Sequence, residues 1–468
     1  MEYNVKTLKD VNLDNKVAVV RVDFNVPIKN GKVDDDTRIR EALPTIEYLK
    51  DHNCKIVLLS HLSRIKTYDD VVSGKKSLRP VFDVLKHLLP GIQMEFVEDS
   101  KDKNLPNIIK KMVPGSLLLL ENTRYNDVNS KNEVIKEESK NNSSLGKFWG
   151  SLGDVFVNDA FGTCHRAHAS NVGIASNIKS SCVGFLVEKE IKKLSQALVG
   201  QHPIVAIFGG AKVSDKLASI KNIAKIADKL LIGGGMSYTF CKAKGYEIGK
   251  SLVEEDLIET AKEIINELGD KLVLPIDFIV GDNGNPMEIM SGKNVKLENF
   301  PSDKSGYDLG KKSTKIFIKE IKKAKTIIWN GPVGVFENLV FKKGTDKICK
   351  AIAKATEKNF VYSVVGGGDS ASAANKSGFK NSFSHISTGG GASLDFFSGK
   401  ELPGIACIQK IGEKVVQVKQ HELVKVTAKP SIKIVSTTKK PSSTSKSSSS
   451  KSSPKKSTTS YKTKKSKK

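Results

Sequence analysis

The sequence Pro203-Ile-Val-Ala-Ile-Phe-Gly-Gly-Ala-Lys-Val-Ser-Asp-Lys216 passes from a short apolar run, through two glycines, into a helical pattern that starts at Val213. The run 204–208 predicts a buried strand. A strand that turns through glycines into a helix presents free backbone N–H groups, which bind anions. Lys212 and Lys216 flank that turn. A lone Gly-Gly pair more often marks an ordinary strand–helix connection. Other parts of the sequence are therefore needed to distinguish an anion-binding turn from such a connection.

The chain has 468 residues, enough for more than one domain. No apolar run approaches the roughly 18 residues of a membrane span, and the N-terminus contains no apolar signal core. The six cysteines are scattered without a C-x-x-C pair, which indicates neither a zinc site nor a disulfide framework. We therefore expect a cytoplasmic protein with reduced thiols.

The positive charge is concentrated at the C-terminal end. Of the formal charge of +25, the residues from Ile411 onward carry +14, with 16 lysines, two glutamates and no arginine. Residues 436–468 hold 19 serines and threonines and 11 lysines among 33 residues, which predicts a disordered tail. Such a tail is either a solubilising extension or a polycation that binds nucleic acid, anionic lipid or an acidic protein.

In the first half of the chain, four apolar runs of strand length end in polar clusters, with helical patterns between them. The runs are 16–22, 55–59, 116–120 and 154–157. Strands that alternate with helices predict a parallel α/β sheet, and ligands bind such sheets outside the carboxyl ends of the strands. The polar segment 125–145 is expected to be a surface excursion around a helix.

The polar clusters of the first half supply most of one candidate binding site. Its members are Asp23, Asn25, Arg38, His61, Arg64, Arg124 and Arg166. Arginine forks match phosphate and carboxylate geometry, so four arginines suit a small, multiply charged anion, with Asp23 and Asn25 on its hydroxyl groups. The alternative is that each arginine pairs with a nearby acid on the surface, which is harder to accept for four arginines near successive strand ends.

In the second half, the strand ends are rich in glycine. They lie at 209–210, 233–235, 331–334, 366–368 and 389–391, and 271–277 is predicted to be a further short strand. Glycine lets the backbone approach a ligand closely, so several such ends on one sheet suit a nucleotide, although tight strand–helix packing is an alternative. Asp369, at a helix start, is a candidate Mg²⁺ ligand beside phosphate oxygens, or else a helix N-cap.

Several nucleotide-enzyme signatures are missing from the chain. The P-loop sequence, the strict G-x-G-x-x-G fingerprint, H-R-D and D-F-G do not occur. Their absence argues against P-loop proteins, dinucleotide enzymes and protein kinases.

Nine motifs, in this order along the chain, resemble those of the phosphoglycerate kinase family. They are Arg21-Val-Asp-Phe-Asn-Val-Pro27, Ser60-His-Leu-Ser-Arg64, Leu119-Leu-Glu-Asn-Thr-Arg124, Asn158-Asp-Ala-Phe-Gly-Thr-Cys-His-Arg-Ala-His168, Gly209-Gly-Ala-Lys-Val-Ser-Asp-Lys216, Gly233-Gly-Gly-Met236, Trp329-Asn-Gly-Pro-Val-Gly-Val-Phe-Glu337, Gly366-Gly-Gly-Asp-Ser370 and Ser387-Thr-Gly-Gly-Gly-Ala-Ser393. The resemblance runs to about Gly404. It implies two doubly wound, Rossmann-like parallel-sheet domains joined by a hinge helix.

The resemblance also implies an organisation and a reaction. A phosphoglycerate-binding domain would span 1–184, a nucleotide-binding domain with the hinge helix 185–402, a return segment to the first domain 403–411, and the basic tail 412–468. The implied reaction is reversible transfer of the acyl phosphate of 1,3-bisphosphoglycerate to ADP, giving 3-phosphoglycerate and ATP with Mg²⁺, in a monomer. The alternative is a second or replaced role as a protein that binds acidic surfaces through the tail.

The family motifs assign site residues by position. The phosphoglycerate site would be the Asp23, Asn25, Arg38, His61, Arg64, Arg124 and Arg166 set already named. The nucleotide site would comprise Gly210, Ala211, Lys216, Gly234, Asn330, Pro332, Val333, Glu337, Gly366, Gly367, Gly368, Asp369 and Ser370. Within it, Glu337 would bind the ribose and Asp369 the metal–nucleotide.

Phosphoryl transfer leaves the protein mainly positioning and charge stabilisation to perform. We predict that Lys212 follows the migrating phosphoryl group and that Arg38 neutralises it from the opposite domain. The helix predicted at 187–198 would be the hinge for a closure that excludes water. Ser63 and Ile65 depart from the Gly and Pro usual in the family, which puts the shape of the loop before Arg64 in doubt. Cys164 and Asp395 are further departures, from Ala and Glu.

Overall fold

A computed structural model describes residues 3–412 of the chain. Residues 1–2 and 413–468 lie outside the described part, and with them nearly all of the predicted basic tail. Among the described residues, no helix is both long and apolar enough to cross a bilayer.

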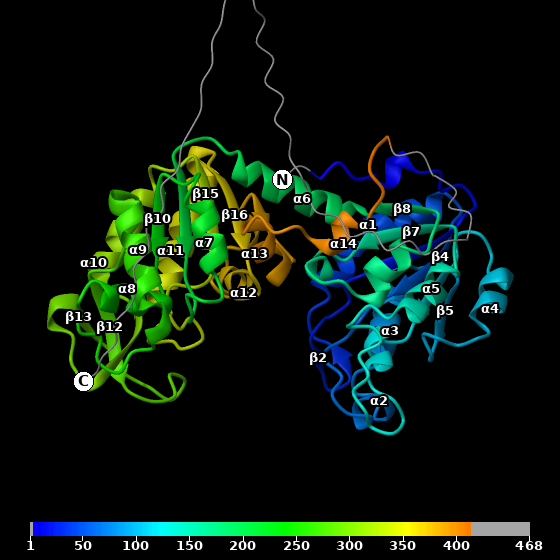
Figure 1. Ribbon diagram of the computed structural model, residues 1–468, viewed down its shortest axis with the longest axis horizontal. Helices are drawn as coiled ribbons and strands as arrows, with labels where there is room; N and C mark the ends of the chain where they lie inside the picture. The colour runs from blue at the N-terminus through cyan, green and yellow to red at the C-terminus, as the bar shows by residue number, and fades with distance from the viewer. Residues whose placement is uncertain (1–2, 413–468) are drawn as a thin grey trace, which may run out of the picture. The chain divides into compact units, whose positions relative to one another are not determined.

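The first sheet consists of six strands that all run parallel. Their order is β5-β6-β4-β1-β7-β8, with bounds Met94–Val97, Leu117–Leu120, Lys55–Leu59, Val17–Val22, Val155–Asp159 and Ser180–Val183. Helices cover both faces of this sheet (Figure 1). Helices α1 (Thr37–Asp51) and α3 (Arg79–Leu88) bury their apolar sides against one face. Helices α4 (Leu105–Lys111) and α5 (Ser143–Gly150) pack on the other.

The second sheet repeats this plan with strands from later in the chain. Its parallel order is β11-β10-β9-β15-β16-β17, with bounds Leu272–Val273, Lys229–Ile232, Ile204–Phe208, Thr326–Asn330, Tyr362–Gly366 and His385–Ile386. One face packs on α7 (Leu217–Ile223), α8 (Met236–Ala243) and α9 (Ile258–Leu268). The other packs on α10 (Lys311–Ile321), α11 (Lys343–Asn359) and α12 (Gly368–Lys376). The prediction of two doubly wound parallel sheets is confirmed.

Helix α6, Phe185–Leu198, connects the last strand of the first sheet to the first strand of the second. Its N-terminus is held by Asp159 at the end of β7, whose Oδ1 accepts hydrogen bonds from the N–H groups of Leu186 and Val187 at 2.9 and 3.3 Å. An acidic group at a helix N-terminus satisfies free donors and favours the helix dipole. The connecting helix is therefore fixed at its start to the first sheet.

The middle of α6 is tied to the far edge of the second sheet. Glu190 is buried, and one of its carboxylate oxygens lies 2.8 Å from His385 Nε2 on β17. The other oxygen accepts from the N–H and the hydroxyl of Thr388, at 2.7 and 2.9 Å. One helix thus contacts both sheets through buried carboxylates.

The end of the described chain returns to the first sheet after α13 (Gly391–Phe397) and α14 (Pro403–Ala406). Asn158 Nδ2 donates to the carbonyl of Gly404 at 2.6 Å. The backbone N–H of Lys6 donates to the carbonyl of Gln409 at 2.8 Å, beside an antiparallel bridge between Val5 and Lys410. Residues 404–411 are therefore joined by hydrogen bonds to β7 and to the N-terminal residues.

Two element predictions are corrected by the structure. The segment 271–277 is not one strand: Pro275 lacks the N–H that a ladder needs, and the run divides between β11 of the second sheet and β12 (Asp277–Asp282). Strand β12 belongs to a small antiparallel sheet with β13 (Lys293–Lys296) and β14 (Lys304–Leu309). The helix predicted from Val213 begins at Leu217, because 213–216 form turns.

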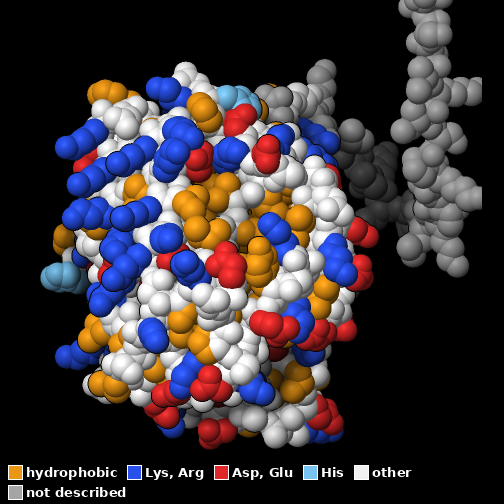
Figure 2. Space-filling model, turned by 90° about the vertical axis from the view of Figure 1, so that its left-hand side faces the viewer, with side chains coloured by type: hydrophobic (Ala, Val, Ile, Leu, Met, Phe, Trp, Pro, Cys, Tyr) orange, Lys and Arg blue, Asp and Glu red, His pale blue; other side chains and the backbone are white. Residues whose placement is uncertain are grey.

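The surface of the described part is basic well away from the strand ends. On the face shown in Figure 2, Lys and Arg side chains gather along one side. Helices α10 and α11 border a cavity of about 440 Å³ lined by Lys322, Lys347, Lys350, Lys354 and Lys358. The excess positive charge of the chain therefore does not belong to one binding site alone.

Candidate active site

A cavity of about 400 Å³ opens at the carboxyl ends of the strands of the first sheet. We call it the arginine cavity. It is lined by Asp23, Asn25, Arg38, His61, Ser63, Arg64, Arg124, Gly162, Thr163, His165, Arg166, His168 and Gly389–Gly391. The structure thus brings together all seven residues that the sequence placed in the anion site, because β1, β4, β6 and β7 end at the same edge.

The arginines of this cavity differ in their pairing. Arg38 Nη1 lies 2.9 Å from Asp23 Oδ2, so one arginine is paired with a carboxylate. Arg64, Arg124 and Arg166 form no ion pair with any described carboxylate; Arg124 donates instead to the carbonyl of Ser63 at 2.6 Å. The alternative interpretation, in which each arginine pairs with an acid, therefore applies to Arg38 alone. The remaining guanidinium groups are available to an anionic ligand.

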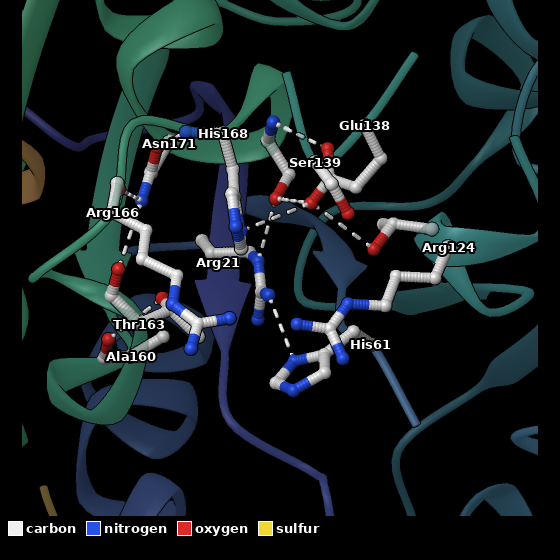
Figure 3. A network of polar contacts seen from close by, with 12 residues as sticks. Arg21, His61, Arg124, Glu138, Ser139, Ala160, Thr163, Arg166, His168 and Asn171 are labelled. Carbon is white, nitrogen blue, oxygen red and sulfur yellow. Dashed lines mark hydrogen bonds and ion pairs between the residues drawn. The ribbon is translucent and has the colours of Figure 1, made fainter. Parts of the chain in front are cut away.

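A buried layer of polar residues supports the arginine cavity (Figure 3). The Arg21 guanidinium, fully buried on β1, donates from Nε to Ser170 Oγ at 2.8 Å. Its Nη2 lies 3.0 Å from His61 Nδ1. The Ser170 hydroxyl and N–H both reach the carboxylate of Glu138, at 2.5 and 2.9 Å. Glu138 is itself fully buried and lies 3.8 Å from His168 Nδ1.

The expectation for 125–145 was wrong at this point. The segment does contain exposed residues and the first three residues of α5, but it also places Glu138 and Asp127 in the interior. Apolar periodicity gave no signal for Glu138, because its burial depends on Ser170, to which it is hydrogen-bonded, and on Arg21, which Ser170 contacts in turn; both lie far away in the sequence. The burial of a glutamate such as Glu138 therefore becomes evident only from the structure.

Electrostatics keep the histidines of this cavity neutral. Burial, followed by the nearby charges of Arg21 and Arg124, holds the pKa of His61 well below its usual value. The same causes lower the pKa of His168 to about 3. The positive charge offered to a ligand therefore comes from the arginines, while the histidines contribute neutral donors and acceptors.

The glycines of 389–391 line the arginine cavity, although the sequence grouped them with the nucleotide-type strand ends. A Cβ on Gly389 would lie 2.4 Å from the Phe161 ring, and one on Gly162 would lie 2.5 Å from Asp23 Oδ2. Close packing across the cavity rim accounts for both glycines. The segment after β17 therefore reaches the edge of the first sheet.

The loop before Arg64 keeps a conformation that glycine favours. Ser63 has a φ of +59°, which a non-glycine residue adopts only rarely. Its N–H donates to Asn25 Oδ1 at 2.8 Å, and its carbonyl accepts from Arg124. These two hydrogen bonds hold the left-handed turn with serine in place, so Arg64 still lines the cavity.

A second cavity, of about 560 Å³, lies at the strand ends of the second sheet and is called the glycine cavity. Of the predicted nucleotide residues, its lining includes Gly210, Ala211, Gly234, Pro332, Glu337 and Asp369. It also includes residues that the sequence did not single out, among them Tyr238, Leu252, Asn283, Tyr307 and Phe336. A Cβ on Gly234, where φ is +67°, would lie 2.7 Å from the backbone nitrogen of Gly210. The two glycine turns are in direct contact.

The other predicted nucleotide residues support the cavity from beneath or lie beside it. Lys216 Nζ donates to the carbonyl of Asn330 at 2.9 Å, and the Gly331 N–H donates to Ser370 Oγ at 2.5 Å. Val333 is fully buried. The remaining three, Gly366, Gly367 and Gly368, form the end of β16 and the start of α12. These seven are absent from the lining of the glycine cavity, and Gly368 lines a neighbouring cavity with Arg38.

The turn after β9 does not offer all of its N–H groups to a ligand. Glu254 Oε2 accepts from the N–H groups of Val213 and Ser214, at 2.5 and 3.2 Å, and Oε1 accepts from the Ser214 hydroxyl at 2.5 Å. The carboxylate of Glu254 therefore binds N–H groups of the turn where the sequence predicted a bound anion. Lys212 is exposed in the same turn and is not part of the glycine-cavity lining.

The glycine cavity offers few side chains that could bind a metal ion. No group of three or more His, Cys, Asp or Glu that could hold a metal occurs within residues 3–412. Asp369 lines the cavity as an exposed carboxylate in the first turn of α12. A single carboxylate fits Mg²⁺ that is held chiefly by phosphate oxygens and water, and does not fit a dedicated protein cage.

Two doubly wound sheets, one with an arginine-lined cavity and one with a glycine-lined cavity, define an α/β enzyme of the phosphotransferase type. The family model for phosphoglycerate kinase matches residues 8–400, and the chain belongs to the phosphoglycerate kinase family. The phosphoglycerate kinase of Malacoplasma penetrans (strain HF-2) is 60% identical over 426 residues, which are 90% of this chain and 90% of that protein. That of Enterococcus faecalis (strain ATCC 700802 / V583) is 50% identical over 407 residues, 86% of this chain and 98% of that protein.

Solved structures agree with this family. Phosphoglycerate kinase from Coxiella burnetii matches with a TM-score of 0.73 at 38% identity. The match covers 86% of this chain and 98% of the Coxiella burnetii chain. Phosphoglycerate kinase from Pyrococcus horikoshii OT3 matches with a TM-score of 0.70 at 31% identity and the same coverage. The chain is therefore a kinase of glycolysis, as the sequence motifs indicated.

Proposed function

We propose that the arginine cavity binds 3-phosphoglycerate and 1,3-bisphosphoglycerate, and that the glycine cavity binds ADP and ATP. The reaction is reversible transfer of the acyl phosphate of 1,3-bisphosphoglycerate to ADP, which gives 3-phosphoglycerate and ATP. The observation that carries the division of sites is that Arg64, Arg124 and Arg166 line one cavity without an ion-pair partner among the described carboxylates. A ligand with a phosphate and a carboxylate supplies the missing negative charge.

The protein contributes position and charge to the transfer. The reaction needs no protein nucleophile, since the carboxylate of 3-phosphoglycerate and the terminal phosphate of ADP are the two acceptors. Arg38, which lines the arginine cavity, and Lys212, exposed in the turn after β9, are the cations assigned to the migrating phosphoryl group. Positive charge aimed at the transferring group stabilises the transition state more than the ground state.

Asp369 is the residue assigned to Mg²⁺, together with the phosphate oxygens of the nucleotide. When bound, the ion neutralises charge on the phosphates during transfer. Lys216, close beneath Gly210 and Gly331, adds a cation on the same side. Glu337, in the cavity lining, is assigned to the ribose hydroxyls.

Two domains that close on each other bring the reactants together in this proposal. Residues 1–184 form the phosphoglycerate domain and 185–402 the nucleotide domain, with 403–411 returning to the first. Helix α6 is the hinge, supported by its contacts with Asp159 at one end and with His385 and Thr388 in the middle. Closure excludes water, which would otherwise hydrolyse the acyl phosphate.

The same proposal extends to the setting of the enzyme. A cytoplasmic monomer accords with the place of this reaction in glycolysis. The comparisons give no support to a role in which binding through the tail replaces catalysis, because the family match covers residues 8–400 and leaves the tail out. A polyanionic partner for the tail, such as nucleic acid, anionic lipid or an acidic protein, stays a prediction from its charge.

A coupled assay tests the proposed function. ATP formation from 1,3-bisphosphoglycerate and ADP is measured with Mg²⁺ and with a chelator, for wild type, Arg124→Ala and Arg79→Ala. Arg79 is an exposed arginine paired with Glu98 and serves as the matched control. We expect Arg124→Ala to lower kcat/KM for 1,3-bisphosphoglycerate by at least about tenfold, the scale of a lost charged hydrogen bond. Absence of ATP formation by the wild type contradicts the proposal.

A further inference from the structure

Four buried side chains form a continuous chain of hydrogen bonds from the interior to the arginine cavity. They are Glu138, Ser170, Arg21 and His61, which we call the Glu138 relay. Three of them have no exposed surface, and His61 is 5% exposed at the cavity wall. Neither the sequence motifs nor the family assignment gives Glu138 a role. The inference below rests on the proposed function of the arginine cavity.

The direction of every hydrogen bond in the relay follows from the chemistry of its donors. A guanidinium group only donates, so Ser170 Oγ accepts from Arg21 Nε and His61 Nδ1 accepts from Arg21 Nη2. The single hydroxyl proton of Ser170 then points to Glu138 Oε1, at 2.5 Å. Glu138 must be an acceptor at this position, and its second oxygen accepts from the Ser170 N–H.

The same logic fixes the state of His61. Because Nδ1 accepts a hydrogen bond, the ring proton of the neutral imidazole is on Nε2. Figure 3 shows Nδ1 directed at Arg21 and the other ring nitrogen directed away from it. His61 therefore presents a fixed N–H donor to a ligand, provided that Arg21 keeps its place.

Arg21 is held by the carbonyl of Val22, which accepts from Nη1, and by Ser170, which links it to Glu138. A fully buried guanidinium needs a counter-charge, and Arg21 forms no direct ion pair with a described carboxylate. Ser170, whose hydroxyl accepts from Arg21, donates in turn to Glu138, so Glu138 is the acid linked to Arg21. Without that charge, Arg21 would turn toward the anion in the cavity or toward Asp23, and His61 would lose its fixed tautomer.

We propose that Glu138 is a positioning residue for phosphoglycerate binding, acting through Ser170 and Arg21 on the tautomer and orientation of His61. Glu138 touches no substrate in this proposal. Its effect is on affinity for the three-carbon acid in the ground state and the transition state alike, so KM for 3-phosphoglycerate depends on it more than kcat does.

The test compares Glu138→Gln with Asp127→Asn in the full-length chain. Asp127 is a control for the loss of a nearby buried charge: it is a buried carboxylate eleven residues earlier and it binds Ser139. Its charge acts through space on Arg124 and Glu138, but it is not hydrogen-bonded to any member of the relay. We expect Glu138→Gln to raise KM for 3-phosphoglycerate about tenfold, with kcat and KM for ATP changed by less than about threefold. Asp127→Asn is expected to lower Tm and, since its charge acts on Arg124 only through space, to change KM for 3-phosphoglycerate by less than about threefold.

A second readout does not depend on turnover. The ¹⁵N chemical shifts of the His61 ring distinguish the Nε2–H tautomer from the Nδ1–H tautomer. We expect a pure Nε2–H form in the wild type and in Asp127→Asn, and a mixture in Glu138→Gln. If Glu138→Gln does not fold, Ser170→Ala interrupts the same relay with the carboxylate retained, and the same changes are expected.

The possible results separate the two claims. A wild type that makes no ATP overturns the proposed function, and the His61 tautomer still decides whether the relay exists. The positioning role is overturned if the wild type is active and Glu138→Gln lowers Tm but leaves the His61 tautomer and KM for 3-phosphoglycerate unchanged. Equal KM changes in Glu138→Gln and Asp127→Asn would also overturn it.

Discussion

Lys216 shows how burial beneath a ligand site sets the charge of a single residue. Burial lowers its pKa to about 8, and the opposing charges of Asp369 and Asp215 only partly offset that effect. The ammonium group is therefore charged below about pH 8 and neutral above it. Phosphate binding nearby requires the charged form.

Nucleotide affinity should consequently depend on pH. We expect the Kd for ADP to be flat from about pH 7 to 7.5, where the terminal phosphate of ADP is largely ionised, and to rise above pH 8, as Lys216 loses its proton. Lys216→Met is expected to bind ADP weakly at every pH, with no such break. Calorimetric titration of both proteins across this range checks the prediction, and a break of equal size in Lys216→Met would refute it.

Lys212 lies in the same turn but is exposed and makes no salt bridge with the described acids. If it follows the migrating phosphoryl group, its contact forms only during transfer. Lys212→Ala should then lower kcat by at least about 100-fold with ADP affinity nearly unchanged. Near-normal turnover in that variant, measured by the coupled assay, would remove Lys212 from the mechanism.

The residues of the arginine cavity were predictable because they follow strands. The carboxyl ends of parallel strands meet at one edge, so Asn25, Arg64 and Arg124 had to lie near each other. Glu138 follows no strand, and Glu254 reaches the turn after β9 from about 40 residues away. Long-range polar contacts of this kind carry no local pattern in the sequence.

At the scale of elements, the start of α6 depends on a buried acid. Burial raises the pKa of Asp159 to about 6 from its usual value of 3.8, and the hydrogen bonds from the helix N-terminus oppose the rise. Between about pH 4 and pH 6 the folded protein then binds more protons at this site than the unfolded chain does. Ionisation of Asp159 in this interval costs stability, so the free energy of unfolding falls as pH rises through it.

The variant Asp159→Asn isolates this effect, because its side-chain oxygen still accepts from Leu186 and Val187. We expect the free energy of unfolding of the wild type, measured relative to Asp159→Asn, to fall from about pH 4 to pH 6 and to stay constant above. Denaturant titrations at matched pH values give the free energies of unfolding of the wild type and of Asp159→Asn. A relative stability that increases over this interval would contradict the burial argument.

Element positions were predictable where apolar runs were continuous and failed where backbone chemistry intervened. The run 204–208 is β9 as expected. Pro275 divided a predicted strand between two sheets, and the carboxylate of Glu254 holds 213–214 in a turn, so that α7 starts later. The division of the strand could have been predicted from Pro275. The late start of α7 could not, because it depends on Glu254, which is distant in the sequence.

For the whole molecule, the site residues named above all lie before Gly404, and the described end of the chain is hydrogen-bonded to the N-terminus at Asn4 and Lys6. A chain that ends at Gly412 keeps these contacts. We expect it to retain kcat and both KM values within about twofold. Loss of activity on truncation, measured by the same coupled assay with Tm as a control for folding, would assign residues 413–468 to catalysis.

The sequence alternation predicted two doubly wound sheets, but not the strand orders β5-β6-β4-β1-β7-β8 and β11-β10-β9-β15-β16-β17. Order depends on which apolar faces pack together, and these contacts join distant segments. The same contacts bring Gly389–Gly391 from after the second sheet to the arginine cavity. Site composition therefore follows from the whole fold.

In the proposed function, the two substrates bind at the strand ends of different sheets. Calorimetric binding of ADP and of 3-phosphoglycerate to Arg38→Ala, each measured alone, tests it most directly. We expect an ADP Kd within about twofold of the wild type, and a 3-phosphoglycerate Kd raised by at least about tenfold, as for a lost charged hydrogen bond. If Arg38→Ala folds, keeps its 3-phosphoglycerate affinity and loses ADP binding, then the substrates are not divided between the sheets in this way.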